Sequence, residues 1–360
     1  PSPSAAPTPR PSSGMSTTGS LATGRWGNST TVLDDGRVLV VGGFSGADAG
    51  VVSMAELYDP KTGKFTRTAA LNRPRALHTA TVLSDGRVLI AGGMSDTIAP
   101  VQAEVYDPKT GQFTTTGSLT AIRWGHTAVR LADGRVLVMG GETTVNGNSY
   151  SVLDTAELYD PETGTFSPTG SMASFRVWYT ATLLTDGRVL VVGGSYGTST
   201  NTYPKVAELY DPSTGKFSVT GSLAIGRSGH TATRLADGRV LIAGGKDDSS
   251  IFASAELYDP TTGKFTTTGS MSSARDYPTS TLLPDGRVLI AGGRNWSGGA
   301  WENYASTEIY NPATGKFTSG SPLAVARSRH TAVTLQDGSI LLVGGRVEGP
   351  SIKACELYQP

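Results

Sequence analysis

The stretch Asp85-Gly-Arg-Val-Leu-Ile-Ala-Gly-Gly93 decides the fold, because close variants of it recur along the whole chain. Neighbouring copies begin 48 to 53 residues apart. Self-similarity at a period of about fifty residues is the signature of an array of equivalent structural units. The copies begin at Asp35, Asp85, Asp133, Asp186, Asp237, Asp285 and, as Asp-Gly-Ser-Ile-Leu, Asp337.

Each unit contains four strand signals. In the second unit these are Ala76–Leu83, Arg87–Gly92, Gln102–Tyr106 and Gln112–Thr116. The Asp-Gly step between the first two is typical of a hairpin turn, since glycine readily adopts a positive φ. A single four-stranded sheet cannot bury both of its faces, so we expect the units to close into a ring. The sequence therefore predicts an all-β, seven-bladed β-propeller.

The two ends of the chain predict how the ring closes. The seventh unit stops after its third strand, whereas Met15–Leu21 reads like the fourth-strand segment Thr114–Leu119. We therefore expect the N-terminal strand to complete the last blade, so that the propeller spans residues 14–360. Residues 1–13 are rich in Pro, Ser and Thr and predict a flexible tether. Because such tethers follow the signal peptide or lipid anchor of exported bacterial proteins, we expect a secreted, periplasmic or cell-surface protein.

Composition restricts the classes of partner. Thirty Lys and Arg balance thirty Asp and Glu, so the chain has no basic excess for binding nucleic acid. No apolar run approaches the length of a transmembrane helix. The single cysteine, Cys355, excludes an intramolecular disulfide. We expect a monomer.

The units with Asp-Gly-Arg-Val-Leu-Val-Val-Gly-Gly and Ala-Glu-Leu-Tyr-Asp-Pro segments resemble bacterial kelch repeats and the propeller domain of galactose oxidase. The resemblance covers residues 15–360. The segment Ala274-Arg-Asp-Tyr277, followed by Asn295-Trp296, is similar to the blade that carries the copper-ligand tyrosine and stacking tryptophan of galactose oxidase. The resemblance thus implies that Tyr277 and Trp296 take those two places, with copper as the alternative to a protein without cofactor.

The sequence departs from galactose oxidase at three points. The only cysteine, Cys355, replaces a repeat alanine, so none is placed to cross-link Tyr277. No first strand begins with an adjacent Tyr-His pair, and the chain ends where that family has a further domain. These departures argue against galactose-oxidase chemistry, and we assign no catalytic residue and no metal ligand.

Most of the polar residues that suggest chemistry follow the repeat. An arginine opens every first strand and a glutamate lies in every third strand, which predicts a structural ion pair in each blade. The arginines are Arg25, Arg75, Arg123, Arg176, Arg227, Arg275 and Arg327, and the glutamates are Glu56, Glu104, Glu157, Glu208, Glu256, Glu308 and Glu356. All four histidines follow this arginine by three residues, so we expect them to bond a neighbouring blade rather than a metal ion.

The tryptophans do not follow the repeat, and all five fall in loops expected on one face of the ring. Concentrated exposed aromatic rings usually mark an interaction surface. Charged residues fall in the same loops, which also vary most in length. We expect the binding residues to be Trp26, Trp124, Trp178, Tyr179, Tyr277, Trp296, Trp301, Glu142, Asp276, Arg294, Arg329 and Arg346.

Two functions are consistent with this face. The first is binding of a carbohydrate or of a protein or peptide segment, since flat aromatic platforms with scattered hydrogen-bonding groups suit either ligand. The alternative is an enzyme on the same face. It would be a metal-dependent oxidoreductase at Tyr277, or another carbohydrate-active enzyme using Glu142, Asp276 or Glu302 in acid–base chemistry.

Overall fold

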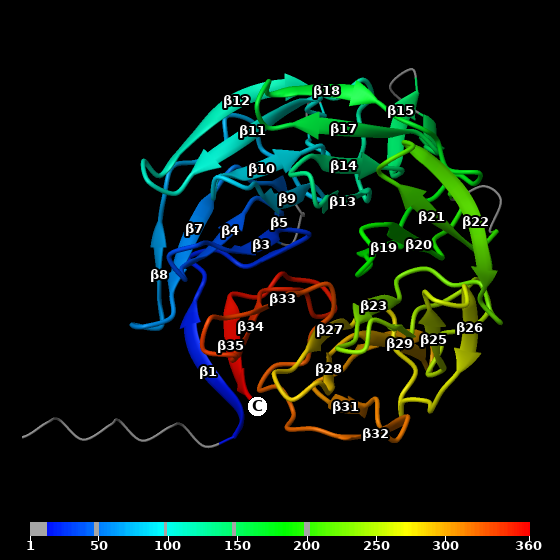
Figure 1. Cartoon of the computed structure of the whole chain (residues 1–360). Helices are drawn as coiled ribbons and strands as arrows, with labels where there is room; N and C mark the ends of the chain where they lie inside the picture. Colours follow the sequence, from blue (N-terminus) through cyan, green and yellow to red (C-terminus); the bar gives the residue numbers. More distant parts are fainter. Residues whose placement is uncertain (1–12, 47–49, 97–98, 146–148, 198–201) are drawn as a thin grey trace, which may run out of the picture.

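The computed structural model describes residues 13–46, 50–96, 99–145, 149–197 and 202–360. Residues 1–12, almost the whole of the predicted tether, lie outside this part of the chain. Within the described ranges the strands form seven four-stranded antiparallel sheets, arranged around a ring in Figure 1. The predicted all-β propeller is confirmed. Among the same residues, no helix has the length and apolar character needed to cross a bilayer.

Each sheet is one blade, and the strands below run from the centre of the ring to its rim. Blade one contains β3 (Ser29–Val32), β4 (Val38–Val41), β7 (Ala55–Asp59) and β8 (Lys64–Arg67). Blade two contains β9 (Thr79–Val82), β10 (Val88–Ala91), β11 (Gln102–Asp107) and β12 (Gln112–Ser118). Blade three contains β13 (Thr127–Arg130), β14 (Val136–Met139), β17 (Ala156–Asp160) and β18 (Thr165–Pro168). Blade four contains β19 (Thr180–Leu183), β20 (Val189–Val192), β21 (Val206–Asp211) and β22 (Lys216–Ser222).

The remaining blades follow the same order. Blade five contains β23 (Thr231–Arg234), β24 (Val240–Ala243), β25 (Ala255–Asp259) and β26 (Lys264–Thr267). Blade six contains β27 (Thr279–Leu282), β28 (Val288–Ala291), β31 (Thr307–Asn311) and β32 (Lys316–Ser319). Blade seven contains β33 (Thr331–Thr334), β34 (Ile340–Val343), β35 (Ala354–Gln359) and β1 (Gly14–Ser20). Short strands in the loops are β2 (Arg25–Trp26), β5 (Phe44–Ser45), β6 (Gly50–Val51), β15 (Glu142–Val145), β16 (Ser149–Val152), β29 (Arg294–Ser297) and β30 (Ala300–Asn303).

The Gly-Gly pairs of the repeat connect each blade to the next. The second glycine donates its amide to the carbonyl of the next blade's opening arginine, over 2.7–2.9 Å, and the last such bond runs from Gly345 back to Arg25. The first glycine must lack a side chain, because a Cβ atom there would lie 2.3–2.8 Å from that same carbonyl oxygen. The repeat therefore specifies a hydrogen bond between blades at every junction around the ring.

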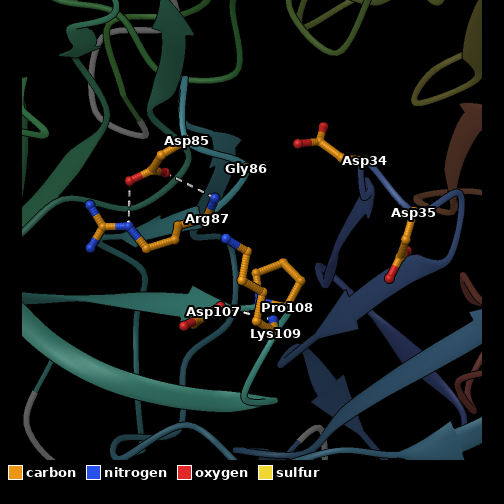
Figure 2. A pocket seen from close by; sticks show the side chains of 8 residues that line it. All are labelled: Asp34, Asp35, Asp85, Gly86, Arg87, Asp107, Pro108 and Lys109. Atoms are coloured by element: carbon orange, nitrogen blue, oxygen red, sulfur yellow. Dashed lines mark hydrogen bonds and ion pairs between the residues drawn. The ribbon is translucent and has the colours of Figure 1, made fainter.

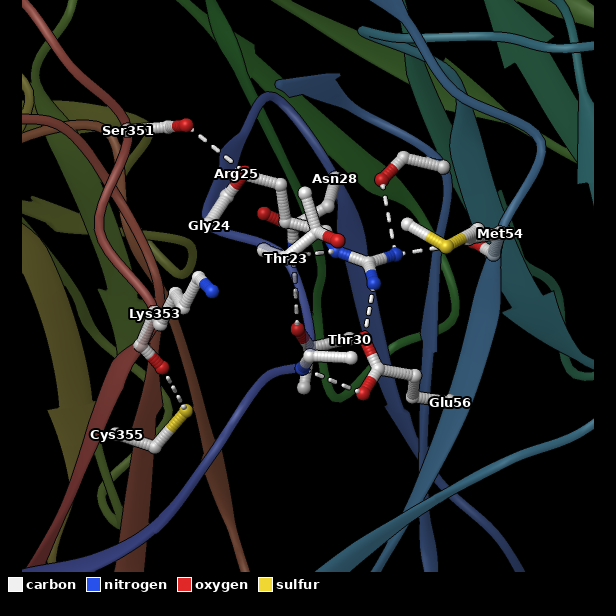
Figure 3. Close-up of polar contacts among 12 residues, drawn as sticks. Thr23, Gly24, Arg25, Asn28, Thr30, Met54, Glu56, Ser351, Lys353 and Cys355 are labelled. Carbon is white, nitrogen blue, oxygen red and sulfur yellow. Dashed lines mark hydrogen bonds and ion pairs between the residues drawn. The ribbon is translucent and has the colours of Figure 1, made fainter. Parts of the chain in front are cut away.

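The N-terminal strand occupies the fourth-strand position of blade seven. In Figure 1 β1 lies beside β35, and the two strands pair in antiparallel register from Gly14 opposite Gln359 to Thr17 opposite Glu356. Thr18 also bonds the Tyr58 hydroxyl over 2.8 Å, as fourth-strand threonines of other blades bond the next blade's tyrosine. Further bonds join the two ends at the site drawn in Figure 3, where the Ser351 hydroxyl donates to the Gly24 carbonyl over 2.8 Å.

The repeated arginines and glutamates form buried ion pairs, as the sequence predicted. Every opening arginine is 0% exposed and pairs within its own blade with the third-strand glutamate. Figure 3 shows the first of these pairs, Arg25 with Glu56. Each arginine also donates to the carbonyl of the first glycine of the Gly-Gly pair, for example Arg123 to Gly140 over 2.9 Å. These charges are satisfied internally and are not available to a ligand.

Candidate ligand-binding face

One residue in each blade, two positions after the opening arginine, forms a ring around the central channel. These seven residues precede the innermost strands and all have positive φ angles between 52° and 64°. The amide of one donates to the carbonyl of the preceding one at six of the seven steps, over 2.8–3.5 Å. The members of this inner ring are Gly27, Leu77, Gly125, Trp178, Gly229, Tyr277 and Arg329.

Four members of the inner ring carry side chains in a conformation that favours glycine. Within the described chain, Leu77, Trp178, Tyr277 and Arg329 are the non-glycine residues with positive φ. Left-handed backbone costs an L-residue roughly 1–2 kcal/mol. The left-handed conformation of Leu77 also interrupts the extended backbone. The first strand of blade two therefore begins at Thr79 rather than at the predicted Ala76. Strain of this kind concentrates at ligand-binding and active sites.

The side chains of the inner ring surround a cavity of about 190 Å³. Trp26, Trp178, Tyr277 and Arg329 line it together with Leu77. The rings of Trp178 and Tyr277 meet edge to face at 5.9 Å. Trp26 stacks on Phe44 at 4.4 Å, which fixes its indole at the rim of the cavity. Four of the residues that the sequence singled out for ligand binding, from four different blades, therefore line one cavity.

Three arginines and a lysine lie against these aromatic rings or against the ring of Trp301. The Arg329 guanidinium lies 4.2 Å from the centre of the Tyr277 ring and 5.1 Å from that of Trp26. Arg346 approaches the other side of the cluster, 5.2 Å from Trp26. The remaining cations face Trp301, with Arg294 at 3.7 Å and Lys246 at 6.0 Å from the ring centre. We call Trp26, Trp178, Tyr277, Trp301, Lys246, Arg294, Arg329 and Arg346 the aromatic–cationic cluster.

Asp276 is the buried carboxylate beside this cluster. It is 0% exposed and pairs with Arg294 over 3.2 Å, while its Oδ1 atom has no hydrogen-bond partner among the described residues. Burial raises the pKa of Asp276, although the charges of Arg294, Lys246 and Arg329 oppose that rise. The Asp276 side chain therefore fixes the position of Arg294 through this ion pair, and Asp276 itself is not accessible at the surface.

Trp124 and Glu142 form a separate site in the next loop zone. The Trp124 indole donates to the Glu142 carboxylate over 3.1 Å, and the two residues pair across their backbones. Tyr150, 64% exposed, contacts Trp124 edge to face at 5.6 Å. Burial raises the pKa of Glu142, while the indole hydrogen bond lowers it. Trp124 is itself only 4% exposed, so Tyr150 and the carboxylate are what this site presents to a ligand.

Tyr179 lies away from the face on which the sequence placed it. Its side chain is 5% exposed and its hydroxyl bonds Thr127 over 3.0 Å and the Met139 carbonyl, in the neighbouring blade. Burial raises the pKa of Tyr179 well above its ordinary value. It stands where other blades carry histidine, so its role is in packing between blades. Trp296, by contrast, is 54% exposed and meets Trp301 edge to face on the β29–β30 hairpin.

The histidines connect blades, as predicted. The Nε2 atoms of His78, His126, His230 and His330 lie 2.8–3.0 Å from a serine or threonine hydroxyl of the preceding blade. No three His, Cys, Asp or Glu side chains of the described residues are grouped as a metal site. The guanidiniums of Arg329 and Arg294 lie 4.2 and 5.5 Å from the centre of the Tyr277 ring and repel a cation, and the neighbouring Asp276 carboxylate already pairs with Arg294. The residues present therefore do not fit the copper ion that the resemblance implied.

The opposite face has a different character. One hollow on that face, of about 350 Å³, lies between the turns of blades one and two and is drawn in Figure 2. The figure shows Asp85 bonded to Arg87 of the same turn, a pair that recurs in most blades. Because these turn residues follow the repeat and already bind each other, they present no distinctive ligand site.

Sequence reasoning missed two features of the face. One is Leu77, the fourth member of the inner ring that is not glycine. An alignment of the repeats could have found it, because glycine fills the equivalent position in three blades and indicates a positive φ there. The other is that the long loop Arg294–Tyr304 forms the hairpin β29–β30, for which the alternation around Ser297-Gly-Gly-Ala300 was the available signal.

Comparison with known proteins agrees with this architecture. A family model described as the KLHDC2/KLHL20/DRC7 Kelch-repeats domain matches residues 125–345, and a kelch-motif model matches residues 25–72. No curated protein matches the chain. A solved structure described as a novel fungal alcohol oxidase of the AA5 family, in complex with copper, is similar in fold, with a TM-score of 0.74. It is 18% identical in sequence, and the alignment covers 96% of this chain and 75% of the oxidase. Since the first model alone matches more than half of the residues, the chain belongs to the kelch-repeat family.

Proposed function

We propose that the protein is a binding module whose ligand, a carbohydrate or a protein or peptide segment, occupies the aromatic–cationic cluster at the mouth of the channel. The observation that supports this most is the inner ring. Four side chains are held there in strained backbone around one cavity, although glycine serves the same position in three other blades. Such strain has no benefit for the fold, so a role in recognition explains its retention.

The composition of the cluster suits recognition. The face presents rigid aromatic rings and arginines, the residue types that contribute most of the energy at binding sites. On this side of the blades the repeated arginines and third-strand glutamates are engaged in buried ion pairs, which leaves the non-periodic residues to contact a ligand. A kelch propeller then acts as a rigid scaffold, and its variable loops determine what is bound.

A substitution at Trp178 tests the proposal. Wild-type protein is screened against a glycan array and a peptide library, and its best ligand is titrated by calorimetry. Replacing Trp178 by glycine removes the indole and relieves the positive φ of 57°, so the variant should fold. We expect a loss of about 2 kcal/mol, or roughly 30-fold in Kd. The control Val219→Ala alters an exposed residue on the outer strand β22 and should bind normally. Unchanged affinity in Trp178→Gly would overturn the proposal.

Acid–base catalysis on the same face is a second candidate, because burial raises the pKa of both Asp276 and Glu142. Raised carboxyl pKa values are common among catalytic acids. The test is turnover of any glycan that the wild type binds, compared with Asp276→Asn and Glu142→Gln. Loss of turnover with retained binding in either variant would favour the enzyme. Absence of products from the wild type would favour the binding module.

Export remains part of the proposal, supported by the Pro/Ser/Thr-rich composition of residues 1–13. Fractionation of the native host, followed by immunodetection, tests it. Recovery of the protein in the cytoplasmic fraction alone would exclude export.

A further inference from the structure

We propose, building on the binding role above, that the ligand at the channel mouth is a sugar residue that carries a carboxylate, of the uronic acid type. Its carboxylate would be held by Arg329 and Arg346, and its ring would stack among Trp26, Trp178 and Tyr277.

The evidence for a negative charge is a group of cations without partners. Arg329, Arg346 and Lys246 make no side-chain hydrogen bond and no ion pair within the described residues, and the Nε atom of Arg329 is buried without an acceptor. The guanidiniums of Arg329 and Arg346 lie 5.1 and 5.2 Å from the centre of the same Trp26 ring. Consistent with this closeness, desolvation and the charge of Arg329 lower the pKa of both Arg294 and Arg346. Like charges collected in a partly buried site are destabilising until an anion enters.

Four carboxylates near the cluster already accept hydrogen bonds from other groups, although the Oδ1 atom of Asp276 has no partner among the described residues. Asp276 pairs with Arg294, and Glu142 accepts from the Trp124 indole. Asp248 accepts from the Tyr203 hydroxyl over 2.8 Å, and Asp247 accepts from the amides of its own turn. Of these four carboxylates only Asp276 forms an ion pair with a cation of the cluster, so Arg329, Arg346 and Lys246 remain without an ion-pair partner among the described residues. A carboxylate suits this site, since two guanidinium groups can each donate charge-assisted hydrogen bonds to it.

The size and walls of the cavity indicate a single ring. Its volume of about 190 Å³ lies below the 300–1,000 Å³ typical of sites for drug-sized ligands, so it admits one ring-sized group at a time. Two indoles and a phenol surround that group. The exposed Trp296, beyond the rim on the β29–β30 hairpin, offers a platform for a further ring of a longer glycan.

The backbone of the inner ring favours a sugar over an extended peptide. A peptide strand gains much of its affinity from main-chain hydrogen bonds. Here six of the seven inner-ring amides already donate to the neighbouring ring carbonyl. The residues beside them, such as Ser328 and Arg346, pair with each other across their backbones. Side chains, above all aromatic faces and guanidiniums, are what the mouth presents to its ligand.

Matched pairs of ligands test the charge and the sugar separately. Methyl glucuronide is compared with methyl glucoside, and methyl galacturonide with methyl galactoside, by calorimetry on the whole protein at low and physiological salt. A blocked tetraglutamate peptide provides a negative charge without a sugar ring. We expect at least one uronide to bind about tenfold or more tightly than its neutral partner, because a hydrogen bond to a charged group contributes that much. Added salt should reduce the difference.

Two variants identify the groups responsible. Arg329→Gly removes the guanidinium and installs the residue that Gly27, Gly125 and Gly229 provide at the equivalent position, and it should bring the uronide-to-neutral ratio below about threefold. Arg130→Ala, an exposed arginine at the far end of the same kind of strand, should leave the ratio unchanged. The same loss in both variants would overturn the assignment to Arg329.

The outcomes separate this inference from the proposed function. Equal binding of uronides and neutral glycosides would overturn the charged ligand and leave the carbohydrate-binding face intact. Binding of the glutamate peptide alone would overturn the sugar and leave the binding face intact. Absence of binding by every sugar and peptide, here and in the library screens, would overturn both.

Discussion

Lowering the pH from 7 to 5 should destabilise the protein through its four histidines. His78, His126, His230 and His330 are 5–7% exposed, and their Nδ1 atoms have no hydrogen-bond partner among the described residues. Burial, reinforced by the charge of the blade's opening arginine, lowers the pKa of each histidine to about 3. A proton added to any of these rings would place an unpaired charge between two blades.

The magnitude follows from proton linkage. The pKa of each folded histidine lies below its unfolded value of 6.5, so the unfolded chain binds more protons between these limits. The stabilisation is complete above pH 6.5 and is lost as the pH falls towards 3. Between pH 7 and pH 5 the loss is about 2 kcal/mol for each histidine and roughly 8 kcal/mol for all of them. That is comparable with the entire free energy of unfolding of a typical domain, about 5–15 kcal/mol.

The assay is urea unfolding followed by tryptophan fluorescence at pH 7 and pH 5. His126→Asn is the informative variant, because Asn28 fills the equivalent position in blade one and bonds Thr331 of the preceding blade over 3.4 Å. Its loss of stability on acidification should be about 2 kcal/mol smaller than that of the wild type. Comparing the two proteins cancels the contributions of Asp276 and Glu142, whose raised pKa values act in the opposite direction. An identical pH dependence in both proteins would refute the reasoning.

Three further changes test the fold and the face. Arg329→Gly should be at least as stable as the wild type to urea, with a free energy of unfolding up to about 1 kcal/mol higher, because glycine adopts the left-handed conformation without strain. A large decrease in the free energy of unfolding would show that the inner ring is not strained. Glu157→Gln leaves Arg123 buried without its counter-ion and should cost about 3 kcal/mol in the same assay, whereas an unchanged stability would mean that the pair is dispensable. Deleting residues 13–20 exposes the edge of β35, so light scattering should detect concentration-dependent association, and a monomeric, fully stable product would contradict the role of β1.

Much of the fold could be predicted because every unit repeats the same physical requirements. The first glycine of each Gly-Gly pair has no room for a Cβ atom beside the next blade, and each buried arginine needs a glutamate as its counter-ion. These residues therefore recur in every unit and can be recognised in the sequence. The contacts of the face follow from no such repetition. Arg329 and Trp26 come from different units and meet only because the ring closes, which no local pattern specifies. Tyr179 shows the converse, since its alignment with the buried histidines outweighs its aromatic character.

The inner ring combines two departures from what stability alone would favour. Glycine at all seven positions would remove the backbone strain, and an ion-pair partner for Arg329 would neutralise its charge. This chain keeps the strain at Leu77, Trp178, Tyr277 and Arg329, and at Arg329 it also keeps a cation without an ion-pair partner among the described residues. Elsewhere in the described part of the chain, the repeated buried arginines pair with glutamates and every residue with a positive φ is glycine. Independent costs that coincide at one cavity are best explained by a single cause, which is a ligand that contacts the aromatic rings and the guanidiniums together. The variant Arg329→Gly tests this explanation directly. If strain and charge have a common cause, the variant should be more stable than the wild type and should also lose its preference for a uronide over the neutral glycoside.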